Sequence, residues 1–117
     1  MKLRLHAGSL RLRLSQSEVT RLGELGRVED SIEFSPGNEL CYAMETGSAD
    51  TVTATFDNAN IHVTVPEKVA KEWIESDQTG IEASTGPLKV LIEKDFKCLH
   101  REPQAGEDSF PNPLAAG

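Results

Sequence analysis

The stretch KLRLHAGSLRLRLSQSEV, residues 2–19, alternates charged or polar residues with leucines on both sides of an Ala-Gly pair. Successive side chains of a strand point to opposite faces, so this alternation predicts two strands, each with one apolar and one cationic face. Ala7-Gly8 stands where a two-residue turn would join them, and glycine tolerates the positive φ that such turns require. That turn sets Leu5 opposite Leu10. The stretch therefore predicts a hairpin with a self-consistent register.

A helix, and then a second copy of this order of elements, are predicted after the hairpin. Ser15 and Glu18 have the spacing of a capping box, which marks the start of a helix. The later stretch TATFDNANIHVTVPEKV, residues 53–69, again indicates strand, turn and strand, with Phe56 among the residues that face inward. Pro66 lies near a helix start, where proline is favoured. Further strands are predicted over residues 31–34, 39–45, 80–84 and 88–96.

Two regions, residues 2–45 and 52–93, share the order strand, strand, helix, strand, strand. Because one such unit leaves a sheet face bare, two packed copies would bury a common core. The sequence thus predicts an α+β fold of internally duplicated units, with a mostly antiparallel, curled or barrel-like sheet and two short helices. Chance similarity is the alternative, since any α+β chain alternates strands and turns. The matched landmarks are Leu10 with Ile61, Leu14 with Val65, Val19 with Val69, Leu22 with Trp73, Ile32 with Ile81, Gly37 with Gly86 and Leu40 with Leu88.

A change of composition divides the chain near residue 100. Residues 1–100 carry the periodic pattern and are predicted to form a single domain, which suits a chain of 117 residues. Residues 101–117 are rich in proline, glycine, alanine and acids and show no strand or helix period. We interpret them as a tail, or as a strap that docks on the domain through Phe110, a large apolar residue followed by stiff prolines.

The charge and cysteine content indicate a cytoplasmic protein. The formal net charge of −7 argues against general nucleic-acid binding, which usually needs a basic protein. No apolar run approaches the ~20 residues of a membrane helix, so we expect neither membrane contact nor a secretory signal. The two cysteines are too few for a disulfide-stapled secreted domain, and both are expected to be reduced. Monomer and homodimer both stay open.

Four basic residues of the first hairpin share its polar face, with His6 at their end, and we name these four the cationic stripe: Lys2, Arg4, Arg11 and Arg13. Like charges opposite each other on a hairpin are destabilising unless something offsets them. One offset is a bound anion, either a small molecule or a protein partner, which makes the stripe a candidate ligand-binding site. The other is pairing with acids of neighbouring strands, favoured by 19 acidic residues against 12 basic ones. The acids considered are Glu33, Glu45, Glu82 and Glu93.

The sequence offers no catalytic or metal motif. None of the Gly-x-Ser-x-Gly, His-Glu-x-x-His or phosphate-loop patterns occurs. Cys98 and His100 form one close pair, but a structural zinc needs four ligands, and Cys41, His6 and His62 would have to converge on them. We therefore predict no catalytic residue, no metal site and no cofactor.

The segments SLRLRLSQSEV, GRVEDSIEF, LCY and the terminal DFKCLHRE with FPNP resemble those of a family of small bacterial proteins of unknown function. The resemblance covers nearly the whole chain. It implies a bacterial cytoplasmic source and an ordered C-terminal tail. Because no activity is assigned to the family, it transfers no functional residues.

These observations favour a non-enzymatic binding or regulatory module that contacts an anionic ligand or partner through the cationic stripe. The alternative is an enzyme that acts on phosphate-bearing small molecules in a barrel-like site. Acids clustered with a metal beside the stripe would favour the enzyme. Acids paired with the stripe on an open surface would favour the binding module.

Overall fold

The computed structural model describes residues 1–96 of the chain. The predicted strap over residues 101–117, with Phe110, and the Cys98–His100 pair lie outside the described residues. Every predicted strand and helix is found, although β3 begins at Arg27 rather than at Ser31. The elements of residues 1–96 are β1 (Lys2–His6), β2 (Ser9–Leu14), α1 (Gln16–Leu25), β3 (Arg27–Ser35), β4 (Asn38–Gly47), β5 (Thr53–Asp57), β6 (Asn60–Pro66), α2 (Glu67–Glu75), β7 (Gly80–Thr85) and β8 (Leu88–Lys94).

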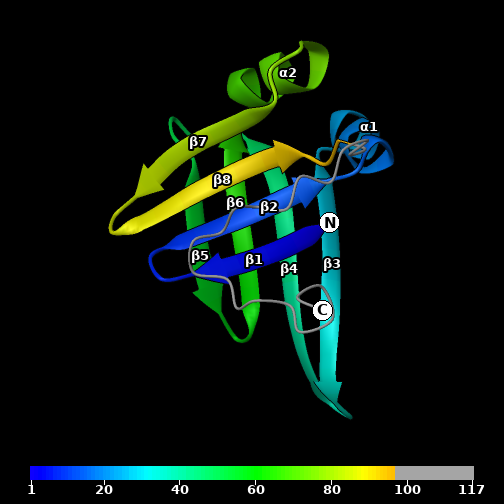
Figure 1. Cartoon of the computed structure of the whole chain (residues 1–117), viewed down its shortest axis with the longest axis vertical. Helices are drawn as coiled ribbons and strands as arrows, with labels where there is room; N and C mark the ends of the chain where they lie inside the picture. The colour runs from blue at the N-terminus through cyan, green and yellow to red at the C-terminus, as the bar shows by residue number, and fades with distance from the viewer. Residues whose placement is uncertain (97–117) are drawn as a thin grey trace, which may run out of the picture.

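The eight strands of residues 1–96 form two four-stranded sheets. Sheet A has the order β1-β2-β8-β7 and sheet B the order β3-β4-β6-β5. Within each sheet two antiparallel hairpins are joined at the centre by a parallel pair, β2 with β8 and β4 with β6. The sheets stack face to face with their strands crossing, and both helices lie at one end of the stack (Figure 1). Each sheet therefore combines a hairpin from the first half of the chain with one from the second.

The predicted barrel-like sheet is wrong. A closed barrel needs every strand to pair on both sides. In the described part of the chain β1 and β7 are the edges of sheet A, and β3 and β5 are the edges of sheet B, with no ladder between the sheets. The strand alternation indicates how each hairpin pairs internally, but it carries no signal for how the hairpins join. Each parallel central pair joins two hairpins into one open sheet of four strands.

The first hairpin has the predicted register. Leu5 stands opposite Leu10 and Leu3 opposite Leu12. The positive φ falls on Ala7, at 47°, and not on the glycine that follows it. Both turn types favoured in two-residue hairpins need a positive φ at the first central position, which explains this placement.

The two helices begin where predicted but by different means. Ser15 caps α1 and Glu18 completes the capping box, while Gly26, with φ of 76°, ends the helix in the left-handed region. The N-cap of α2 is Pro66, which makes no side-chain hydrogen bond. Trp73 of α2 is fully buried, whereas Val69 of the same helix is 37% exposed. No helix of residues 1–96 is long and apolar enough to cross a membrane.

The core lies between the two sheets and under the helices. Its largest fully buried side chains come from both sheets and both helices: Trp73, Leu12, Leu14, Leu22, Met44, Ile92, Val63, Val65 and Val90. The Trp73 indole Nε1 donates a hydrogen bond to the Thr79 carbonyl at 3.2 Å, which satisfies its polar atom. Two residues predicted to point inward, Leu5 and Phe56, are instead 58% and 70% exposed. Both lie near hairpin tips, where the core ends.

Candidate functional site

The cationic stripe lies on the outer face of sheet A. The hairpin register puts Lys2 opposite Arg13 and Arg4 opposite Arg11. On the other side of β2, the parallel strand β8 places Glu93 beside Arg13. The four basic residues thus share one face, as predicted, and their role as a ligand site stays a prediction.

Acids at the end of β8 pair with three of the four stripe residues. Lys2 Nζ lies 3.1 Å from Asp95 Oδ2. Arg11 Nε and Arg13 Nη2 each lie 3.6 Å from the same oxygen, Glu93 Oε1. All of these side chains are partly exposed, so each pair contributes about 0–1 kcal/mol. The pairing lowers the repulsion along the stripe without removing it.

The prediction that neighbouring acids offset the stripe is right for only one of the four acids considered. Glu93 pairs with it, whereas Glu82 pairs with Lys89 at 3.1 Å. Glu33 and Glu45 belong to sheet B. Asp95 was missed because the parallel pairing of β2 with β8, which brings it to Lys2, leaves no mark in the sequence pattern.

A small hollow opens at the Arg4–Arg11 end of the stripe. Arg4, His6, Ser9 and Arg11 line it, and its volume is about 110 Å³. Within residues 1–96, Arg4 has no acidic partner within ion-pair distance. The Arg11 Nε atom is buried, and at 3.6 Å from Glu93 it is too far for a hydrogen bond, so this N–H lacks an acceptor among the described residues. The hollow is therefore lined by two arginines, one of which has no acidic partner among the described residues.

The outer face of sheet B carries the opposite charge. Its acids are Glu29, Glu33, Glu39, Glu45 and Asp57, against one cation of these four strands, Arg27. Arg27 lies 3.3 Å from a carboxylate oxygen of both Glu29 and Glu45. His62 Nε2 lies 2.8 Å from Glu45 Oε1. Glu33 stands directly opposite Glu39.

An apolar groove lies between the two sheets near the hairpin tips. Its volume is about 330 Å³, and Thr55 is the one polar residue among those that line it: Leu5, Leu10, Leu40, Ala54, Thr55, Phe56, Ile61 and Leu88. This groove was not predicted, because the alternating pattern places Leu5 and Phe56 in the core. Their position next to the turns was the available signal, since the last pair before a hairpin tip has few neighbours to pack against.

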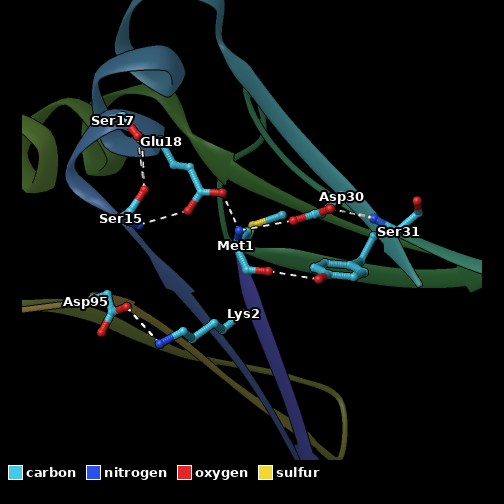
Figure 2. A network of polar contacts seen from close by, with 9 residues as sticks. Met1, Lys2, Ser15, Ser17, Glu18, Asp30, Ser31 and Asp95 are labelled. Carbon is cyan, nitrogen blue, oxygen red and sulfur yellow. Dashed lines mark hydrogen bonds and ion pairs between the residues drawn. The ribbon is translucent and has the colours of Figure 1, made fainter. Parts of the chain in front are cut away.

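The N-terminal amine of Met1 is the centre of a polar network that ties β1 to α1 and β3 (Figure 2). The amine is buried and donates hydrogen bonds to Glu18 and, at 3.3 Å, to Asp30 Oδ2. The Tyr42 hydroxyl donates to the Met1 carbonyl at 2.8 Å. The same Glu18 side chain accepts from the Ser15 backbone N–H at 2.9 Å, so one carboxylate serves both the helix cap and the amine.

These contacts shift the carboxylates of the network. Burial acts to raise the pKa of Glu18, but hydrogen bonds from the amine and from Ser15 outweigh it and hold the pKa below the usual 4.5. The Ser31 backbone N–H, followed by the amine, lowers the pKa of Asp30 below 3.8. Both carboxylates are therefore more stable as anions in the folded state, which makes the network a structural one that links neighbouring elements.

Cys41 is the one cysteine of residues 1–96. Burial, followed by the charge and hydrogen bond of Glu39, raises the pKa of the Cys41 thiol, whereas a nucleophilic cysteine needs a lowered one. No group of three or more His, Cys, Asp or Glu side chains in this part of the chain is placed to hold a metal ion. The candidate sites are thus the cationic hollow and the apolar groove.

The architecture is that of an α+β protein with two mixed four-stranded sheets. The chain belongs to a family of unknown function (DUF7009), whose model matches residues 1–114. No curated protein and no solved structure matches the chain. The predicted kinship with a family of unknown function is confirmed, and its bacterial origin stays a prediction.

Proposed function

We propose that this domain is a non-enzymatic binding module that holds an anionic group of a ligand or partner at the cationic stripe. The observation that carries the proposal is the hollow beside Arg4, where two arginines stand directly opposite each other. Without a counterion this pair is destabilising. A bound anion would offset the repulsion between the two guanidinium groups through charge-assisted hydrogen bonds.

The surroundings of the stripe favour binding over catalysis. Glu93 and Asp95 are paired with stripe residues on the outer face of an open sheet. Both carboxylates therefore neutralise basic side chains of the stripe. The alternative, an enzyme on phosphate-bearing molecules, relied on a barrel-like interior that the two separate sheets do not form. An open face can hold an anion but excludes little water from it.

The size of the hollow limits what it can hold. Small-molecule sites usually enclose about 300–1,000 Å³. A hollow of about 110 Å³ suits one phosphate- or carboxylate-sized group, not a whole nucleotide. The anion would therefore be one group of a larger ligand, or an acidic or phosphorylated side chain of a protein partner, with the remainder lying on the exposed face.

Thermal unfolding of the full chain with pyrophosphate and with tripolyphosphate tests this proposal. A ligand at 100 dissociation constants stabilises the fold by about 2.7 kcal/mol. At roughly 4 °C for each kcal/mol, the melting temperature should rise by about 10 °C. The rise should shrink as salt is added, because exposed charges are screened over ~8 Å at physiological ionic strength.

Variants separate the hollow from general charge effects. The double change Arg4→Ala, Arg11→Ala should abolish the rise in melting temperature. Lys89→Ala removes a cation of the same sheet face that is paired with Glu82, and it should keep most of the rise. If neither polyanion raises the melting temperature, or if the double variant responds like the wild type, the stripe is not an anion site.

We also propose that the chain arose by internal duplication. If β1–β4 are aligned with β5–β8, the strand order of sheet A becomes that of sheet B, which supports the proposal. The equivalent hairpin registers, Leu12 with Leu3 and Val63 with Ala54, agree with it. Superposition of residues 2–45 on 52–93 in an experimental structure tests it, and different strand paths would contradict it.

The proposed setting is the bacterial cytoplasm. The proposal rests on the acidic composition, the two cysteines expected to be reduced and the resemblance described above. Fractionation of the native host tests it, and recovery of the protein outside the cytoplasm would contradict it.

A further inference from the structure

We propose that the C-terminal segment, residues 97–117, docks into the apolar groove between the sheets and that Phe110 fills it. The groove is lined almost wholly by apolar side chains, and at its rim Leu5 and Phe56 are 58% and 70% exposed. Exposed apolar surface of this kind on a globular domain marks a contact site. The occupant proposed is part of the same chain.

The apolar surface continues beyond the groove along the hairpin of β3 and β4. Ile32 stands opposite Leu40, which lines the groove, and Ile32 is 41% exposed. Phe34, two residues further along β3, is 70% exposed. This hairpin extends past the strands of sheet A (Figure 1). A segment that enters the groove would therefore find a second apolar strip for its remaining side chains.

The chain is long enough to make this connection. β8 begins at the groove with Leu88 and runs away from it to Lys94. The return along one strand of this length is about 23 Å at ~3.3 Å per residue. The residues between Phe96 and Phe110 span up to about 46 Å when extended. The segment thus reaches the groove with slack for a turn.

The composition of the segment suits an apolar groove. Phe110 is the one aromatic residue beyond Phe96, and Pro111 and Pro113 follow it. Prolines restrict the unfolded chain, so less conformational entropy is lost when the segment is ordered. The family model extends to residue 114, which makes the segment part of the same family unit as the strands.

A tethered segment also has an advantage over a separate occupant. A short linker gives an effective concentration in the millimolar range. A second copy of the chain has no such advantage, and it carries the same net charge of −7, so two copies repel each other. We therefore assign the groove to the chain's own C-terminal segment, and a second copy becomes an alternative outcome of the test.

Methyl NMR spectra of the full chain, compared with those of Phe110→Ala, test the assignment. Loss of the aromatic ring should move the methyl signals of Leu5, Leu10 and Leu88, because a ring packed against methyl groups shifts their resonances. The melting temperature should fall by about 6–12 °C, as expected when a buried phenyl group worth about 1.5–3 kcal/mol is removed. Phe96→Ala is the matched control, since Phe96 is 60% exposed and lies outside the groove lining.

The outcomes are distinguishable. Phe110→Leu keeps an apolar side chain without a ring, so it should shift the same methyl signals with a smaller loss of melting temperature, even if Phe110→Ala does not fold. Unchanged groove methyls in both variants overturn the proposal. Groove signals that move with protein concentration but not with Phe110→Leu assign the groove to a second copy, which also overturns it.

Discussion

Sheets A and B have equivalent strand orders, but their outer faces carry opposite charges. On sheet A the hairpin of β1 and β2 presents Arg4 opposite Arg11, and on sheet B the hairpin of β3 and β4 presents Glu33 opposite Glu39. The inner faces, in contrast, are alike, since Leu12 and Val63 stand at corresponding places and both are fully buried. The comparison shows that the core is set by the shared topology, whereas the outer charges are free to diverge.

The two helices repeat this contrast at a smaller scale. α1 has a capping box whose Glu18 also binds the N-terminal amine. In α2 the N-cap residue is Pro66, which makes no side-chain hydrogen bond. The apolar contacts of the helices with the sheets are therefore common to both halves, and the polar network belongs to the first half alone.

The largest expected effect tests the shared core. Leu12→Ala should lower the free energy of unfolding by about 2–5 kcal/mol, the usual cost of a buried leucine. Val63→Ala should lower it by about 2 kcal/mol, because it removes two methyl groups at about 0.8 kcal/mol each and leaves a cavity. Urea titration of both variants measures the losses. A negligible cost at either position would break the equivalence of the two sheets.

A smaller effect tests the polar network of the first half. Glu18→Gln keeps the cap but removes the charge that faces the amine, and at neutral pH it should cost about 1–3 kcal/mol. The lowered pKa of Glu18 stabilises the fold fully above the unfolded value of about 4.5 and progressively less as pH falls through the folded value. The difference between wild type and variant should therefore shrink below pH 4.5.

Denaturant titrations at neutral and acidic pH check this dependence. Glu24→Gln is the matched control, because Glu24 is an exposed residue of the same helix. It should leave the free energy of unfolding nearly unchanged at both values. A cost of Glu18→Gln that stays constant down to acidic pH would show that the amine contact does not stabilise the fold.

The smallest effect sharpens the contrast between the outer faces. Arg4→Ala on sheet A and Glu33→Gln on sheet B each remove one member of a like-charged pair. Each should raise the free energy of unfolding by about 0.2–1 kcal/mol in the absence of ligand. Added polyphosphate should then stabilise Glu33→Gln but not Arg4→Ala. Equal responses of the two variants, measured by thermal unfolding, would mean that the faces differ in sign but not in binding.

The local features of the fold could be predicted from the sequence because they depend on residues close together in the chain. Strand alternation predicted the register of Arg4 with Arg11, and the spacing of Ser15 and Glu18 predicted the helix cap. The joining of β2 to β8 could not be predicted, since any half-buried strand can be the neighbour of another. The prediction of a barrel-like sheet was wrong because it depended on how the hairpins join.

The candidate site shows the same division. The stripe could be assembled from one hairpin, so its four residues were found together. The Asp95 contact and the apolar groove depend on which strands far apart in the chain lie side by side, and no sequence pattern specifies that. Leu5 and Phe56 have the pattern of core residues, and only their places at the ends of strands distinguish them from Leu12 and Val63.

The parallel pair at the centre of sheet A has a consequence for how the protein folds. Ser9 pairs with Lys89, so sheet A is complete only when the first hairpin has paired with a strand from the far end of the described chain. Such pairing gives the protein a high contact order, and the entropy of closing the long loop must be lost before the contact is made. Sheet B, in contrast, is built from the consecutive strands β3 to β6. The nascent chain therefore cannot complete sheet A, or bury the inner face of sheet B against it, before β8 has been synthesised.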